Sequence, residues 1–209
     1  EGTLDTIYMT LVSTFFSYVF GMIMAVILVI TRADGIRPHP VIFRVLDVIV
    51  NLTRSFPFLI LMIAIIPFTR WLVGTTIGNN ATVVPLVVAA APFVARLIEQ
   101  SLLEVDRGVI EAAQSMGAST WQLIWKVFIP EATPSLINGS AIAATTILGY
   151  SAMSGAVGGG GLGKLAIMYG YNRYQNDIMF ATVVLLIIIV QLLQSFGDWA
   201  TRRSDRRIK

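Results

Sequence analysis

Residues 111–130 read Glu-Ala-Ala-Gln-Ser-Met-Gly-Ala-Ser-Thr-Trp-Gln-Leu-Ile-Trp-Lys-Val-Phe-Ile-Pro, a polar stretch between long apolar segments. The Ala, Glu, Leu and Ile residues around its start favour a short helix over about 105–116. Gly117 should end this helix, because glycine adopts the left-handed conformation that often follows a helix.

A second short helix should follow the glycine. Ser119 or Thr120 can cap its N-terminus, Trp121 lies in its first turn, and Pro130 should close it. Taken alone, two such helices are also typical of an amphipathic segment that lies on a membrane surface.

The composition indicates a protein that crosses a membrane several times. Of the 209 residues, 56% are hydrophobic and 13% are charged, and we expect one domain over residues 1–209. The sequence contains no cysteine, which excludes disulfides and thiolate metal sites. The net charge of +3 lies mostly in loops and the tail, so it points to lipid headgroups and not to nucleic acid.

The apolar segments predict an all-α membrane protein with five transmembrane helices. They lie at about 7–30, 52–72, 82–98, 135–154 and 178–196. A polar loop is expected over residues 31–47. The second span is the least regular, with Pro57 suited to a first turn and Pro67 expected to kink or end the helix. Pro134 should open the fourth span.

The basic residues predict the orientation of the chain. With the N-terminus outside and the C-terminus inside, the outer side holds only Arg70, Lys164 and Arg173 of the 15 basic residues. The positive-inside rule therefore favours this topology, and it places the loop at 101–134 in the cytoplasm. Residues 202–209 form a basic tail on the same side.

A glycine run at residues 158–164 matches two phosphate-binding patterns, G-x-x-x-x-G-K and G-x-G-x-x-G. Leu165 stands where the metal-binding Ser or Thr belongs, and no strand precedes the run. The topology also places it outside, away from ATP. We therefore expect a tight, closely packed turn at the mouth of a translocation path.

The sequence shows no catalytic set. The only histidine, His39, lies between two prolines and should be a solvated loop residue. No pair of carboxylates lies within the predicted spans, since Asp47 and Asp198 flank them. Proton-coupled carriers usually carry such groups inside the membrane, so the energy for transport should come from a partner.

The polar stretch at residues 111–130 resembles the EAA loop of ABC importer permeases, E-A-A-x3-G-x9-I-x-L-P. The matching residues are Glu111, Ala112, Ala113, Gly117, Val127, Ile129 and Pro130, with Val for Ile and Ile for Leu as the departures. In that family the loop is cytoplasmic and docks into a groove on the ATPase. The resemblance implies that these positions and Trp121 couple this chain to such a subunit.

Nearly the whole chain is similar to permeases of bacterial methionine ABC importers. The resemblance rests on Arg54–Phe58, Ile66–Arg70, Ala90–Arg96 and Gly149–Gly158. It implies a homodimer with two ATPase subunits inside, which hold ATP and magnesium, and a methionine-binding lipoprotein outside. D- and L-methionine would be the cargo, with no cofactor or catalysis in this chain.

Two alternatives remain open. Relatives of this family move glycine betaine and other amino acids, so the substrate is less secure than the transporter class. A channel-like or structural membrane subunit that needs no ATPase belongs to a different class, and the EAA loop argues against it.

The resemblance also implies a gate in the fourth span, at Tyr150 and Met153. Three residues apart, they share a helix face, and a ring of methionines could close a narrow pore by excluding water. The alternative is ordinary packing or contact with lipid. Because spans four and five offer hydroxyls and backbone groups but no ionisable side chain, we expect weak substrate recognition and specificity in the outer binding protein.

Overall fold

The computed structural model describes residues 1–204, and this part of the chain is built from helices joined by short turns. The α-helices are α1 (Gly2–Thr31), α2 (Pro40–Ser55), α3 (Phe58–Ala64), α4 (Ile66–Val73), α5 (Asn79–Leu103), α6 (Arg107–Ser115), α7 (Thr120–Leu123), α8 (Ile129–Ser154), α9 (Gly161–Leu165) and α10 (Asn176–Ser204). The all-α prediction is confirmed for these residues. Residues 205–209 of the predicted basic tail lie outside the described part, while Arg202 and Arg203 belong to α10.

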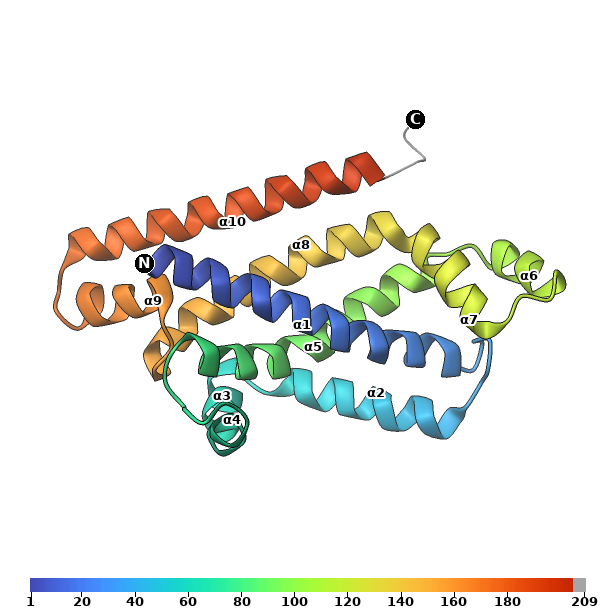
Figure 1. Cartoon of the computed structure of the whole chain (residues 1–209), viewed down its shortest axis with the longest axis horizontal. Helices are drawn as coiled ribbons and strands as arrows, with labels where there is room; N and C mark the ends of the chain where they lie inside the picture. Colours follow the sequence, from blue (N-terminus) through green and yellow to red (C-terminus); the bar gives the residue numbers. More distant parts are fainter. Residues whose placement is uncertain (205–209) are drawn as a thin grey trace.

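The long helices lie roughly side by side (Figure 1). The N-terminus lies beside α9 at one end of the bundle, and α6 and α7 lie at the other. Four helical stretches are long and apolar enough to cross a membrane, and a fifth exists if a bent pair of helices counts as one span. The four are Gly2–Thr31, Asn79–Leu103, Thr120–Val157 and Asn176–Ser204.

The second span differs from its prediction. Residues 40–47, expected in a loop, form the first half of α2, and α2 meets α3 at 104° instead of continuing straight. The bend falls at Phe56 and Pro57, because a residue before proline avoids helical geometry. A second break at Ile65 precedes Pro67, which lies in the first turn of α4, so the expected interruption at Pro67 is confirmed.

All four other spans are longer than expected, with α1 over 2–31 in place of 7–30 and α10 over 176–204 in place of 178–196. Helix α5 covers 79–103 where 82–98 was predicted, with Pro85 and Pro92 inside it. The fourth span does not begin at Pro134. That proline lies inside a helical stretch that starts at Thr120, so the expectation that it opens the span is wrong.

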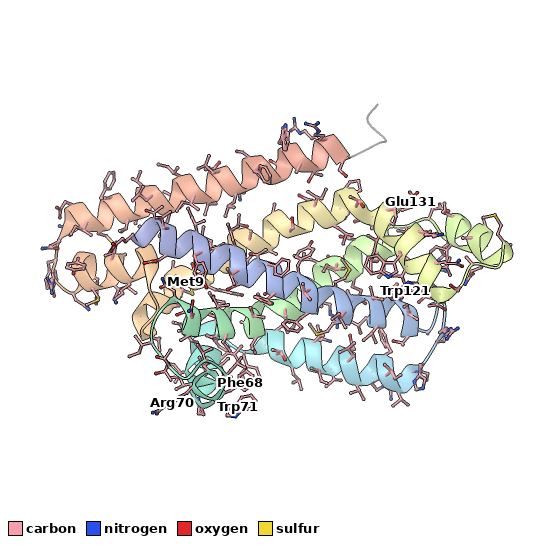
Figure 2. All side chains as sticks on the ribbon, in the orientation of Figure 1. Met9, Phe68, Arg70, Trp71, Trp121 and Glu131 are labelled. Atoms are coloured by element: carbon pink, nitrogen blue, oxygen red, sulfur yellow. The ribbon has the colours of Figure 1, made fainter. Side chains whose placement is uncertain are left out.

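Small residues of α1 allow it to lie closely against α5. Ser13, Ser17 and Gly21 are buried, and a Cβ atom at Gly21 would lie 2.8 Å from Val94 Cγ1. Close approach of this kind is how helices associate in lipid, where the hydrophobic effect offers little. Larger apolar side chains, such as Met9, fill the core beside this contact (Figure 2).

The glycine run forms a tightly packed turn, as expected. Gly158 and Gly161 have positive φ angles of 94° and 76°. A Cβ atom at Gly163 would overlap the backbone of Ala152 in α8. The backbone N–H of Leu162 donates to Thr6 Oγ1 at 2.8 Å, which fastens the turn to α1. The positive φ angles and the close packing explain why glycines occupy these positions.

Candidate functional site

The loop between α5 and α8 is a pair of short, well-capped helices. Asp106 begins α6, with its carboxylate accepting from the backbone N–H of Gly108 at 2.7 Å. After α6, Gly117 has a φ of 81°. The N–H of Gly117 donates to Gln114 O, and that of Ala118 donates to Ala113 O, which is the bond pair of a Schellman motif. The predicted left-handed glycine is confirmed.

Helix α7 begins at a capping box. The Ser119 hydroxyl accepts from the N–H of Gln122, while the Gln122 amide oxygen accepts from the N–H of Ser119. Of the two caps that the sequence allowed, the structure uses Ser119. The backbone N–H groups of Ser119 and Gln122 are therefore both satisfied in an exposed turn.

Pro130 does not end this helix, contrary to expectation. The chain passes from α7 through a π-helical turn, Ile124–Phe128, directly into α8. The N–H of Ile129 bonds to the carbonyl of Ile124, five residues back, in place of the usual four. This wider turn makes room for a proline ring that would otherwise meet the preceding turn. Helix α7 and the fourth span are thus one continuous helical stretch, Thr120–Val157.

One side of the α6–α7 pair belongs to the core and the other is exposed. Ala113, Leu123 and Phe128 are buried in the same cluster as Leu102 of α5. The opposite side presents large apolar groups: Met116 is 82% exposed, Trp121 67% and Trp125 52%. The tryptophan rings lie 5.4 Å apart, and Figure 2 shows Trp121 at this end of the bundle. Apolar surface of this kind marks a contact site.

The predicted EAA positions fall on both sides of this pair. Glu111 and Ala112 are exposed, Ala113 is buried, Ile129 is partly buried and Pro130 is exposed. The Glu111 side chain forms no ion pair with any of residues 1–204. It lines a small cavity of about 190 Å³ beneath α6.

Asp34, which the sequence analysis missed, ties this loop to the membrane helices. It lies after α1 and bonds to Arg32 at 2.8 Å and to Arg107 of α6 at 2.5 Å. A hydrogen bond at its own backbone and the charges of both arginines lower the pKa of the Asp34 carboxyl. The available sequence signal was an acidic residue, Asp34, among basic loop residues. Its partner Arg107 lies 73 residues further along the chain, so the pairing itself was not predictable.

The two predicted gate residues have different surroundings. Tyr150 is partly buried, and its ring stacks on Phe58 of α3 with centroids 4.7 Å apart. Met153 is 51% exposed and belongs to an exposed row of α8 with Asn138, Ile142 and Gly149. Within the single chain, Tyr150 and Met153 thus do not form one surface, and their role as a gate stays a prediction.

The comparisons with known proteins identify the family and the fold of the chain. A sequence model of the family described as "Binding-protein-dependent transport system inner membrane component" matches residues 17–209. The chain belongs to this family. A permease of this family is expected to be a helical membrane protein, as found here.

Full-length relatives have closely similar sequences. The "Probable D-methionine transport system permease protein MetI" of Vibrio cholerae is 50% identical over 206 residues, which cover 99% of this chain and 92% of that protein. The "Methionine import system permease protein MetP" of Bacillus subtilis is 45% identical, covering 99% and 93%.

The fold matches solved permeases as well. A structure described as inward-facing conformations of the MetNI methionine ABC transporter has a TM-score of 0.97 and 47% identity, covering 98% of this chain and 95% of that one. A more distant match, an amino acid ABC transporter with histidines, has a TM-score of 0.78 at 20% identity and shares the fold.

Proposed function

We propose that this protein is the membrane-embedded permease subunit of an ATP-driven ABC importer that carries methionine across the cytoplasmic membrane. The observation that carries the proposal is the TM-score of 0.97, at 47% identity over almost the whole chain, with the MetNI methionine transporter. The names of the V. cholerae and B. subtilis relatives support the same substrate.

The partner ATPase docks on the exposed side of α6 and α7. Met116, Trp121 and Trp125 supply apolar contact area there, and the core beneath them holds the two helices in place. Large aromatic side chains are the residues that most often anchor protein–protein contacts. The ATPase binds ATP and magnesium and catalyses hydrolysis, while this chain transmits the motion.

The docking end lies in the cytoplasm and the N-terminus lies outside. The basic residues favour this orientation, and α6 and α7 lie at the opposite end of the bundle from the N-terminus (Figure 1). A methionine-binding lipoprotein then delivers its cargo at the end that holds α9.

Two copies of the chain enclose the path, with the exposed row of α8 that contains Met153 facing it. Such a row suits a conduit because its members are neutral: one amide, one glycine and two apolar side chains. Alternating exposure of this path to the two sides moves the substrate. Neutral groups contribute only about 1 kcal/mol each to holding a zwitterion, so D- and L-methionine are selected mainly by the lipoprotein.

Reconstitution in proteoliposomes tests the function. The chain is purified with its ATPase, the lipoprotein is added to one side, and uptake of labelled methionine is followed with and without ATP. We expect ATP-dependent uptake that unlabelled methionine competes with and glycine betaine does not. Uptake without the ATPase would support the channel alternative, and preferential uptake of another solute would reassign the substrate.

Equilibrium binding tests the weak-site proposal separately. Methionine is titrated into the purified permease–ATPase complex without lipoprotein, and we expect no saturable site at micromolar concentrations. A micromolar or tighter site that maps to α8 or α10 would show that neutral contacts there read the substrate's charges.

A further inference from the structure

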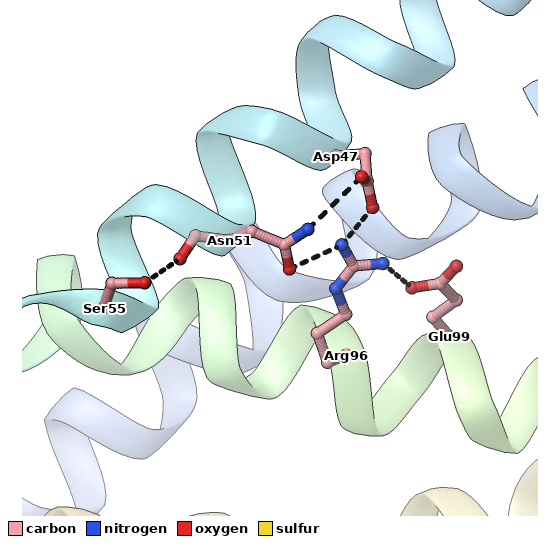
Figure 3. A network of polar contacts seen from close by, with 5 residues as sticks. All are labelled: Asp47, Asn51, Ser55, Arg96 and Glu99. Atoms are coloured by element: carbon pink, nitrogen blue, oxygen red, sulfur yellow. Dashed lines mark hydrogen bonds and ion pairs between the residues drawn. The ribbon is translucent and has the colours of Figure 1, made fainter.

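Four side chains between α2 and α5, here called the Arg96 network, form a charged cluster (Figure 3). The guanidinium of Arg96 on α5 donates to Glu99 of its own helix at 2.6 Å. It also donates to Asp47 and, at 3.0 Å, to Asn51, both on α2. The Asn51 amide donates in turn to Asp47 at 3.2 Å. Asp47, expected to flank a span, therefore lies within a helix and faces an arginine.

These charges lie where charges are costly. The side chains of Arg96 and Glu99 are 18% and 8% exposed, and both belong to a helix that is long and apolar enough to cross a membrane. An unpaired charge there would be strongly destabilising, so each charged side chain of the network needs its partner. Ionisable groups inside membrane helices usually serve function, because apolar residues would hold two helices together at lower cost.

Helix α2 depends on this network because its apolar contacts are few. Val50 is the buried residue of α2. Two more apolar residues, Phe43 and Leu46, are only partly buried. Six others are exposed: Val41, Ile42, Val45, Val48, Ile49 and Leu52. Arg96 donates hydrogen bonds to two residues of α2 that lie one turn apart. These bonds therefore fix the axial position and the rotation of α2 relative to α5. A planar guanidinium suits this, because it donates in several fixed directions.

Helix α2 also connects the network to the candidate gate. After the bend at Phe56 and Pro57, the first residue of α3 is Phe58, whose ring stacks on Tyr150. Tyr150 lies three residues before Met153 on α8. A displacement of α2 against α5 therefore acts on the contact that supports the gate.

The geometry also gives α2 room to move. A cavity of about 790 Å³ opens beside the network, between the end of α1, the start of α2 and α5. Its lining includes Pro40, Phe43, Asp47 and Arg96. Because both terminal nitrogens of the Arg96 guanidinium are already bonded within the protein, the cluster serves as a link between helices and not as an open ligand site.

We propose that Arg96 is a positioning residue for the gate: its bonds to Asp47 and Asn51 hold α2 and α3 where Phe58 stacks on Tyr150, and the importer shifts this contact when the path opens. This inference rests on the proposed function. It assigns Arg96 no contact with substrate. Its effect on the gate passes through α2 and the stacked pair Phe58–Tyr150.

A thiol-accessibility experiment tests the proposal without relying on transport. The sequence has no cysteine, so Met153→Cys supplies the one thiol of this chain, and labelling is read on this chain after it is separated from the ATPase. The complex with its ATPase is reconstituted, and labelling by a membrane-impermeant thiol reagent is timed without ATP. We expect Arg96→Gln to change the labelling rate at least about fivefold, the lower end of typical coupling between sites. Arg96→Lys should have a smaller effect, because it keeps the charge and loses the fixed geometry.

Two further variants separate positioning from stability. The exchange Asp47→Arg with Arg96→Asp should return the labelling rate toward that of the reporter alone. Arg44→Gln, on α2 but outside the network, should leave it unchanged. If Arg96→Gln yields no folded complex, Arg96→Lys and Asp47→Asn are measured in its place.

The outcomes are distinct. A labelling rate equal to that of the reporter alone in every folded network variant overturns the proposal and leaves a purely stabilising ion pair. Methionine transported per ATP should fall in the same variants without the reporter, and an unchanged ratio also counts against it. If methionine uptake is absent but labelling responds to Arg96, the substrate assignment fails and the positioning role stands.

Discussion

Replacing Gly117 offers a direct measure of how the α6–α7 turn supports coupling. Its φ is 81°, and a Cβ atom added there would meet no heavy atom within 4 Å. The cost of a side chain is therefore a backbone cost, about 1–2 kcal/mol for an ordinary L-residue in the left-handed region. A change of this size lowers the ratio of native to altered turn by a factor of roughly 5–30.

The variants Gly117→Asn, Gly117→Ala and Gly117→Val separate backbone strain from bulk. Asparagine is larger than alanine but tolerates the left-handed region better, while β-branched valine tolerates it worst. We expect the ATPase retained on purification, and methionine transported per ATP, to fall in the order Asn, Ala, Val. If Asn proves as damaging as Val, side-chain volume at the ATPase contact is responsible, and the backbone argument is wrong. Wild-type behaviour in all three would remove the turn from the coupling path.

Three further predictions concern other parts of the chain. Met153→Ala should raise the leak of small solutes through proteoliposomes and Met153→Lys should abolish transport or folding, whereas unchanged flux in both would leave Met153 a packing residue. The pKa of the Asp34 carboxyl is lowered below its ordinary value of 3.8. The stability that its charge contributes is therefore fully present above pH 3.8 and is lost as the pH falls through the pKa of the folded state. Methionine transported per ATP should therefore be flat between about pH 5 and 8, and Asp34→Asn should lower it across this range, with recovery in the exchange Asp34→Arg with Arg107→Asp. A ratio insensitive to Asp34→Asn would show that the link to α6 carries no motion. Gly21→Val should lower the free energy of unfolding by about 1–3 kcal/mol, because the new side chain would force α1 away from Val94 of α5. The measurement is the Tm of the complex, which should fall; an unchanged Tm would mean that α1 and α5 are loosely packed.

The sequence was sufficient where local chemistry decides the structure. Apolar length predicted helices in four spans, and the positive φ of Gly117 followed from its place between two helical patterns. The sequence allowed a cap at Ser119 or Thr120, and the structure uses Ser119 in a capping box with Gln122. Each of these features depends on residues within a turn or two of one another.

The missed features depend on contacts between distant parts of the chain. The pattern of residues 40–47 predicts a loop because Arg44 and Asp47 lower their hydropathy, and the partner of Asp47 lies 49 residues further along the chain. Pro130 was read as a helix end, since a π-helical turn that accommodates it has no simple sequence signal. The contact that places Asp47 within a helix is therefore visible only in the folded chain, where α5 lies beside α2.

The broken second span bears on how the chain enters the membrane. An inserting helix needs about 20 apolar residues, but α2 has 16 residues with three charges and α3 has 7. Each Asp or Arg near the centre of an inserting helix costs roughly 2.5–3.5 kcal/mol, so α2 is a poor substrate for the insertion machinery by itself. Helix α5, which brings the guanidinium that Asp47 needs, is synthesised later. We therefore expect the amphipathic α2 to stay at the bilayer surface, and the second crossing to be completed only after α5 has been inserted. Membrane topology in this chain would then not be laid down in the order of its sequence.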